Sequence, residues 1–231
     1  MGRAIQSAAS DVRSQLVQWA RESLAVDGPE VIEEPGGVRL GDRHVDWGEI
    51  VRAWFGGASG EAIGRGYLRR AGDTEEMPPF WEIGCVGVEV RVDGETGLVV
   101  VEKLVAVGDV GCAINPQLVE AQDIGAATMG MGMALSEELR YEDGNLLNGN
   151  LVDYRIPRST DQPEFRSIIA ERGDGVGVYG AKGGGEGALN PVAAAIANAV
   201  YRASGVRMRE APFTPERVWR GLQDRNKSAG E

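Results

Sequence analysis

The fold of this chain is decided by residues 86–107, which read VGVEVRVDGETGLVVVEKLVAV. In 86–92 valine alternates with glycine or charged residues, and this period of two predicts a β-strand with one buried face. Residues 93–97 are typical of a turn. The apolar run 98–107 predicts a second, mostly buried strand, which we expect to pair with the first as an antiparallel hairpin.

Helical patterns lie on both sides of this hairpin. Apolar residues recur at three- and four-residue steps over 4–24, which predicts an amphipathic helix close to the start of the chain. Thr214 and Pro215 suit the N-cap and the first position of a last helix. The remaining patterns predict helices over 47–55, 116–139 and 192–203, a small hairpin over 31–47 and a strand over 165–171. The predicted fold class is therefore α+β, with mixed sheets packed against helices.

The organisation along the chain is predicted to be simple. We expect one domain over 1–231, because no repeat or low-complexity linker divides it. Residues 56–79, rich in Gly, Pro and charge, are expected to form a long loop or arm, and 224–231 a frayed polar tail. Because a helical pattern begins almost at Met1, we also expect a chain that starts where a longer ancestor was divided.

The composition argues against several classes of function. The net charge of −11 disfavours nucleic acid and anionic membranes as partners. No stretch approaches the roughly 20 apolar residues of a membrane span, and no signal peptide is recognisable, so we expect a cytoplasmic protein. His44 is the one histidine, which disfavours a usual zinc site or a histidine-based catalytic centre, and we expect no protein ligand to a metal. Cys85 and Cys112 are expected to be buried free thiols.

A second informative stretch is 180–191, which reads GAKGGGEGALNP and leads into an apolar run. Glycines let backbone amides approach a ligand closely, and a helix that starts after them would direct its first N–H groups at an anion. Glu186 places a carboxylate in the same loop. We therefore interpret this loop as the active-site end of the protein.

Nucleotide-binding interpretations of this region are disfavoured. Residues 175–180 fit GxGxxG, but no Asp or Glu occurs from Ala188 to Arg209, where a dinucleotide site needs one for the ribose. A P-loop needs Ser or Thr after its lysine, whereas Gly183 follows Lys182.

Glycines also interrupt the predicted helix over 116–139. Gly125, Gly130 and Gly132 each cost roughly 1 kcal/mol of helix stability relative to alanine. Their presence indicates that something packs very close to this helix. A neighbouring helix or sheet is the first interpretation, and a ligand that lies against the helix is the alternative.

Four stretches together resemble a known family. They are GDVGCAINPQLVEAQ at 108–122, GMGMALSEEL at 130–139, LVDYRIP at 151–157, and the glycine loop running into AIANAV at 195–200. In this order and spacing they resemble the C-terminal part of the molybdopterin-binding large subunit of the xanthine dehydrogenase and aldehyde oxidase family, the molybdenum hydroxylases. The resemblance covers most of the chain.

The resemblance implies a fold, a cofactor and partners. The fold would be that of the C-terminal molybdenum-cofactor-binding domain of xanthine dehydrogenase. The cofactor would be molybdopterin, in its cytosine dinucleotide form. The partners would be a larger molybdopterin-binding subunit, a subunit with [2Fe-2S] clusters and an FAD subunit. We expect neither the [2Fe-2S] clusters nor FAD on this chain. We expect a small, separately encoded subunit; a piece of one long enzyme is the other possibility.

The resemblance also implies a reaction. Members of this family oxidise an aldehyde or an N-heteroaromatic ring with oxygen derived from water, and a glutamate in the glycine loop acts as the base. Glu186 matches that glutamate. A carboxylate near the reacting centre is physically suited to the role, because its surroundings can tune its pKa.

The same resemblance assigns cofactor-binding residues. Gln122 matches the glutamine that hydrogen-bonds the pterin, with a polar residue on a helix face as the alternative. The backbone of Lys182, Gly183, Gly184 and Gly185 is expected to lie against the cofactor, whereas the Lys182 side chain is either a contact or an ordinary surface lysine. Asp109 and Asn115 are expected to be turn and cap residues.

The chain departs from the family pattern in two ways. The family loop usually reads G-V-G-E followed by prolines, whereas this loop reads GGGEGA at 183–188. The long N-terminal portion that supplies the rest of the cofactor site is absent from this sequence. The alternative function is therefore a non-catalytic structural subunit that buttresses a molybdoenzyme complex, although Glu186 in register argues against it.

Overall fold

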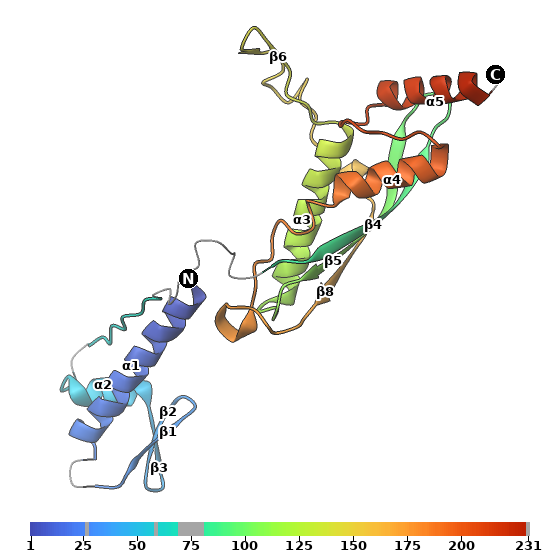
Figure 1. Ribbon diagram of the computed structural model, residues 1–231. Coiled ribbons are helices and arrows are strands. Elements are labelled where there is room, and N and C mark those ends of the chain that lie inside the picture. The colour runs from blue at the N-terminus through green and yellow to red at the C-terminus, as the bar shows by residue number, and fades with distance from the viewer. Residues whose placement is uncertain (26–27, 58–59, 69–80, 230–231) are drawn as a thin grey trace, which may run out of the picture. The chain divides into compact units, whose positions relative to one another are not determined.

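The computed structural model describes residues 1–25, 28–57, 60–68 and 81–229 (Figure 1). Backbone contacts divide the chain into two compact units, Met1–Glu76 and Met77–Glu231, where the sequence interpretation took 1–231 as one domain. No helix within the described ranges is long and apolar enough to cross a membrane.

The first unit packs two helices with a small antiparallel sheet (Figure 1). The helices are α1 (Gly2–Ser23) and α2 (Trp47–Trp54), and the strands in sequence and spatial order are β1 (Val31–Glu34), β2 (Gly37–Leu40) and β3 (Arg43–Asp46). The prediction of a two-stranded hairpin over 31–47 is wrong, because this segment forms three strands. The chain turns at Gly36 as well as at Gly41, both with positive φ. Leu16 and Ala20 of α1 share a buried core with Ile50 of α2.

Part of the expected arm packs against α1. Residues 58–59 and 69–79 of this arm lie outside the described residues, and 60–68 run without regular secondary structure. The Arg65 amide donates to Asp11 Oδ2 at 2.9 Å. A Cβ at Gly64 would lie 2.1 Å from the Ala8 carbonyl oxygen, so the glycine permits this close approach.

The second unit is built on the predicted hairpin. β4 (Gly84–Val92) pairs antiparallel with β5 (Val99–Asp109), and β8 (Glu164–Ala170) adds parallel to the other side of β5. A β-bulge interrupts the hairpin between Glu89 and Val90. A separate two-stranded hairpin, β6 (Tyr141–Glu142) with β7 (Asn145–Leu146), turns at 143–144. The hairpin over 86–107 and the strand over 165–171 are thereby confirmed.

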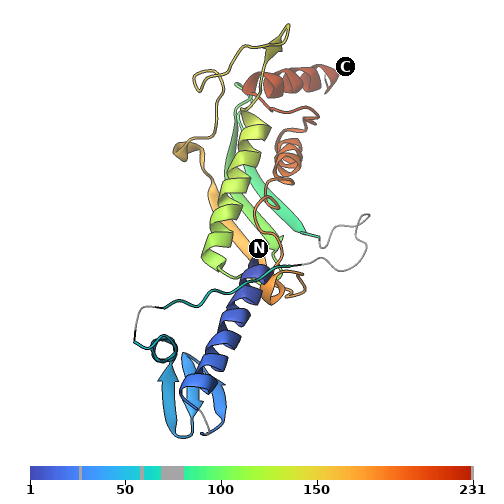
Figure 2. The same cartoon turned by 90° about the vertical axis from the view of Figure 1, so that its left-hand side faces the viewer.

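Three helices complete this unit (Figure 2): α3 (Pro116–Leu135), α4 (Val192–Ser204) and α5 (Pro215–Ala229). α4 packs on β4 and α3 packs on β8, and α3 and α4 also contact each other. The core between them and the sheet includes Leu104, Ile196 and Val200, all fully buried. Two short 3-10 turns, η1 (Ser159–Asp161) and η2 (Val178–Gly180), lie in the connections. The mixed α+β fold is as expected.

The ends of two helices differ from the sequence prediction. α3 ends at Leu135 and not at Leu139. The Ser136 amide makes the last i to i−4 bond, to the Gly132 carbonyl, whereas the Glu137 amide donates to the same carbonyl five residues back and so leaves the helical pattern. α5 runs to Ala229, so the segment expected as a frayed tail is largely helical. Thr214 caps α5 as predicted, since its Oγ1 accepts from the Arg217 amide at 3.3 Å.

The glycines of α3 have different surroundings. A Cβ at Gly130 would lie 2.7 Å from Val192 Cβ, and one at Gly132 would lie 2.8 Å from Pro157 Cδ. Close packing within the chain therefore explains these two. A Cβ at Gly125 would meet nothing within 4 Å, so the described residues leave this position open.

These surroundings predict opposite effects for two similar substitutions. Gly130→Ala should lower the free energy of unfolding by about 1–3 kcal/mol, because its methyl group overlaps Val192 at the start of α4. Gly125→Ala, the matched control in the same helix, should raise it by up to about 1 kcal/mol. Urea unfolding of both variants measures the difference; equal effects would contradict the close contact between α3 and α4.

Candidate functional site

The glycine loop is joined to the carboxyl end of β5 by backbone hydrogen bonds. The Lys182 amide donates to the Val110 carbonyl at 2.8 Å, and the Cys112 amide donates to the Gly180 carbonyl at 3.0 Å. The Gly173 amide donates to the Gly111 carbonyl at 3.1 Å. The segment after β8 and the segment after β5 therefore form one connected structure.

We call the connected segments 109–112 and 173–182 the joint. The close approach of their backbones requires several glycines. Gly111 has φ of 69°, and a Cβ there would lie 2.2 Å from the Gly180 carbonyl oxygen. A Cβ at Gly175 would lie 2.2 Å from the Ala181 carbonyl oxygen. The GxGxxG match at 175–180 is thus part of a loop-to-loop contact, and α4 begins well after it, at Val192. This arrangement differs from the strand–loop–helix of a dinucleotide site.

The Lys182 side chain is held inside the joint. Its ammonium is 2.8 Å from Asp109 Oδ2 and 2.8 Å from Asp174 Oδ1, and the side chain is only 7% exposed. Asp109 Oδ1 also accepts from the Gly111 amide at 3.0 Å. The Lys182 ammonium is thus already engaged by two carboxylates, which makes it neither an ordinary surface lysine nor a free cation for a ligand.

The electrostatics agree with this geometry. The hydrogen bonds to Asp109 and then to Asp174 raise the pKa of Lys182 above its ordinary value. The hydrogen bond from Lys182, followed by that from the Gly111 amide, lowers the pKa of Asp109. Both shifts favour the charged forms. Asp109 is a turn residue as expected. No local pattern predicts that Asp174 shares Lys182 with it, because that pairing depends on how two loops meet.

The tip of the loop, 183–186, remains accessible. Within the described residues its backbone amides make no hydrogen bond, and a Cβ at Gly185 would meet nothing within 4 Å. Glu186 is exposed, and its side chain forms no ion pair or hydrogen bond with other described residues. The tip thus offers uncommitted N–H donors and one carboxylate. Such donors suit a cofactor rich in hydrogen-bond acceptors and negative charge, so the residues present fit molybdopterin.

A second carboxylate lies close to the tip. A Cβ at Gly187 would lie 2.4 Å from Glu82 Oε1, so the Glu82 side chain lies directly against the backbone after Glu186. The sequence interpretation missed Glu82, which precedes β4 and is distant along the chain. No local pattern could have identified it.

The Gln122 side chain forms no hydrogen bond with the described residues of this chain. It is exposed on α3, about 12 Å along the helix axis from Gly130, which meets the start of α4. No hydrogen bond joins it to 182–186 within the described residues. Asn115 caps α3 as expected, with its Oδ1 accepting from the Leu118 amide at 3.1 Å.

Two of the sequence motifs form one cluster. Ser136 Oγ donates to the Arg155 carbonyl at 2.8 Å, and Tyr154 Oη donates to Glu137 Oε2. The hydrogen bond to Glu137 raises the pKa of the Tyr154 hydroxyl. Glu138 pairs with Arg217 at 2.9 Å. The stretches 130–139 and 151–157 therefore belong together in space.

The cysteines differ in part from the prediction. Cys85 and Cys112 are both free thiols. Cys85 is exposed and Cys112 is half-buried, so the expected burial of both is wrong. Cys85 lies on the face of β4 opposite its core-facing valines, and the helices cover only the other face.

Comparisons with known proteins agree on one family. A family model described as a molybdopterin cofactor-binding domain matches residues 1–163. The probable hypoxanthine oxidase XdhD of Escherichia coli strain K12 is 32% identical over 228 residues, covering 96% of this chain and 23% of that protein. The aldehyde oxidoreductase molybdenum-binding subunit PaoC of the same strain is 42% identical over 140 residues, covering 59% of this chain and 19% of that subunit.

A solved structure matches the fold over nearly the whole chain. The quinoline 2-oxidoreductase from Pseudomonas putida 86 has a TM-score of 0.72 and 29% identity, covering 94% of this chain and 29% of that one. The chain thus spans less than a third of the length of these relatives. The motifs, the mixed fold and these matches agree, and the chain belongs to the molybdopterin cofactor-binding family that includes molybdenum-binding subunits of xanthine dehydrogenase and aldehyde oxidoreductase.

Proposed function

We propose that this chain is the cofactor-binding part of a molybdenum hydroxylase and that Glu186 is its general base. The observation that carries the proposal is the loop tip 183–186. Its exposed carboxylate and uncommitted amides project from a joint that Lys182, Asp109 and the backbone hold in place. A loop that is fixed at its base and open at its tip is suited to positioning a base beside a bound reactant.

Each residue of the loop, and Gln122 on α3, has a separate proposed role. The amides of Gly183, Gly184 and Gly185 hold the cofactor from one side, and Gln122 hydrogen-bonds it from α3. When bound, molybdopterin carries the molybdenum at which the substrate is oxidised with oxygen derived from water. Glu186 accepts the proton that the water-derived nucleophile loses. Lys182 contributes its backbone to the site and uses its ammonium to fix the loop.

The substrate class follows from the relatives. Their names give a hypoxanthine oxidase, an aldehyde oxidoreductase and a quinoline 2-oxidoreductase. We therefore propose an N-heteroaromatic or aldehyde substrate, with an electron-poor carbon as the position oxidised.

The partners are proposed from the names of the relatives, two of which are molybdenum-binding subunits. We propose that a larger molybdopterin-binding polypeptide supplies the rest of the site. A [2Fe-2S] subunit and an FAD subunit would carry electrons away. The cytosine dinucleotide form of the cofactor and a cytoplasmic location remain predictions. The alternative is a structural role, in which the joint around Lys182 stabilises a molybdoenzyme complex and another subunit carries out the reaction.

The first test is purification of the tagged chain from its source organism under gentle conditions. Metal analysis and mass spectrometry should find molybdenum, a larger pterin-binding polypeptide and an iron–sulfur protein in constant ratio with the chain. Release of CMP by acid hydrolysis would identify the cytosine dinucleotide form. An untagged strain is the control. A metal-free chain without these partners would refute the proposal.

A further inference from the structure

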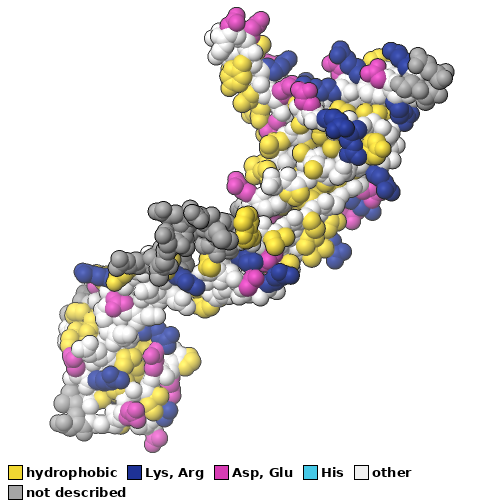
Figure 3. Space-filling view, in the orientation of Figure 1, with side chains coloured by type: hydrophobic (Ala, Val, Ile, Leu, Met, Phe, Trp, Pro, Cys, Tyr) yellow, Lys and Arg dark blue, Asp and Glu magenta, His cyan; other side chains and the backbone are white. Residues whose placement is uncertain are grey.

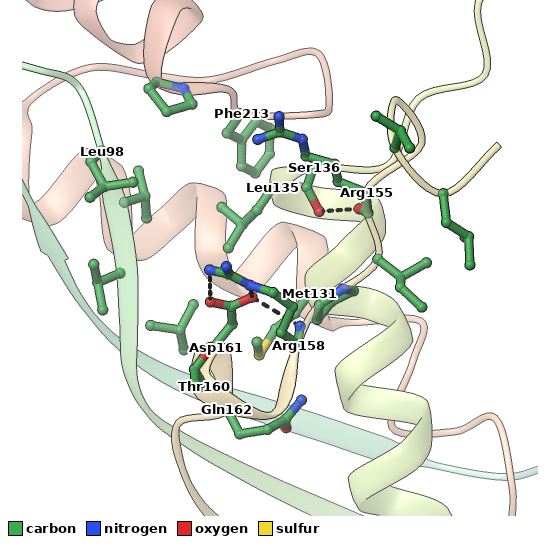
Figure 4. Close-up of a pocket in the computed structure, with 18 residues that line it drawn as sticks. Leu98, Met131, Leu135, Ser136, Arg155, Arg158, Thr160, Asp161, Gln162 and Phe213 are labelled. Atoms are coloured by element: carbon green, nitrogen blue, oxygen red, sulfur yellow. Dashed lines mark hydrogen bonds and ion pairs between the residues drawn. The ribbon is translucent and has the colours of Figure 1, made fainter. Parts of the chain in front are cut away.

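A groove of about 890 Å³ lies in the second unit beside β5 (Figure 4). Its walls come from the start of β5, the end of α3, the segment 151–162 and Phe213. Most lining side chains are apolar, and the polar ones gather on 155–162. None of the residues at the glycine-loop tip lines it, so the groove is separate from the candidate active site.

The groove runs along an open edge of the sheet. β4 pairs with Val99–Val101 on one side of β5, but β8 pairs with β5 only from Lys103 onward. Residues 98–101 all line the groove in succession. Because side chains of a strand alternate between faces, a groove lined by consecutive residues must follow the strand edge. Unpaired edge groups of this kind accept an extended chain by β-addition.

The side chains that line the groove indicate the chemistry of the extended segment that would bind there. Leu151 and Val152 line the groove and are 74% and 78% exposed, and Leu98 is 47% exposed. Hydrophobic side chains are also visible on the surface of the second unit in Figure 3. Exposed apolar side chains that line one groove are typical of an interaction site.

The charged side chains of the groove differ in their pairing with other described residues. Arg158 pairs with Asp161 at 2.9 Å, as Figure 4 shows. Arg155 also lines the groove, is exposed and forms no ion pair with any described residue. An apolar segment with an acidic side chain opposite Arg155 would complement both features.

We propose that an extended, mainly apolar segment of the larger molybdopterin-binding polypeptide adds as a strand to the free edge of β5 at 98–101 and places an acidic side chain on Arg155. The proposal rests on the proposed function, because that function supplies the occupant. The parts of two relatives that align with this chain make up 23% and 19% of their length, so more than two thirds of each relative lies outside the aligned part and offers segments that could fill the groove.

The test uses the complex purified from the source organism. A photo-crosslinking phenylalanine analogue at Leu151 should join to one segment of the larger polypeptide, whereas the same analogue at Ile168, exposed on β8 outside the groove, should not join to that segment. Hydrogen exchange at the amides of 98–101 that face away from β4 should be at least about tenfold slower in the complex than in the chain alone.

Charge reversal gives a second measurement. Arg155→Glu should weaken assembly about tenfold or more, and reversal of the cross-linked acid in the larger polypeptide should restore it. Arg209→Glu, an exposed arginine outside the groove, is the matched control and should have no effect. Circular dichroism checks that both variants fold.

The outcomes separate this inference from the proposed function. The complex could contain molybdenum and the larger polypeptide, yet show unprotected exchange at the amides of 98–101 and equal effects of the two arginine variants. That result would overturn this inference and leave the proposed function intact. Cross-links to a second copy of this chain, or saturable binding of a small molecule in the groove, would overturn it as well. A chain without molybdenum or a larger partner would overturn both.

Discussion

Glu186→Gln is expected to lower kcat of the assembled enzyme by at least about 100-fold, because an amide cannot accept the proton that the carboxylate takes. Molybdenum content, cofactor content and assembly should stay at wild-type levels, since the Glu186 side chain makes no hydrogen bond or ion pair with any described residue. Steady-state kinetics together with metal analysis on the same preparation measure both. A loss of activity with full molybdenum assigns the role to Glu186 and not to the integrity of the site.

Glu82→Gln is the matched control. Glu82 is a carboxylate that lies against Gly187 in the same region, but it is not in register with the family glutamate. Its substitution should change kcat by less than about tenfold. If Glu186→Gln keeps full activity with full molybdenum, the general-base role is refuted and the structural alternative is favoured. If Glu82→Gln is the more damaging variant, the base has been assigned to the wrong carboxylate.

Lys182→Met is expected to have the largest effect on stability. It leaves the Asp109 carboxylate, whose side chain is 8% exposed, without its counter-charge at the base of the loop. Removal of one partner from a buried ion pair is strongly destabilising, and we expect the Tm of the chain to fall by more than about 5 °C. Differential scanning calorimetry measures this shift.

Lys103→Met provides the comparison for this variant. Lys103 and Glu89 are 3.9 Å apart on β5 and β4, and their side chains are 54% and 62% exposed. The loss of such a surface pair should change Tm by less than about 2 °C. Equal shifts in the two variants would mean that the ion cluster around Lys182 does not hold the glycine loop.

The effect of Lys182→Met should depend on pH in a defined way. The pKa of Asp109 lies below its ordinary 3.8 in the folded chain, so its contribution is present above that pH and is lost as pH falls through the folded pKa. The pKa of Lys182 lies above its ordinary 10.5, so its contribution is present below that pH and is lost as pH rises through the folded pKa. The stability difference between wild type and variant should therefore be constant from about pH 5 to 9 and shrink outside that range.

Local patterns were sufficient for most of the fold. The alternation over 86–92, the three- and four-residue steps over 4–24 and the Thr214 cap each depend on neighbouring residues, and each predicted element is present. Of the failures, one is a local turn and one coincides with a tertiary contact. Gly36 adds a turn and a strand to the first unit, and α3 stops where Ser136 and Glu137 bind the segment 154–155.

The candidate site divides in the same way. The sequence by itself determined the family and the residues that match its loop, because order and spacing of motifs are properties of the chain. The tertiary structure decided what those residues do within this chain. It pairs Lys182 with Asp109 and Asp174, explains Gly130 by its contact with Val192, and places Glu82 beside Gly187. It also forms a groove on the free edge of β5. These contacts join residues that are distant along the chain, and only the packing of sheet, helices and loops brings them to the same point in space.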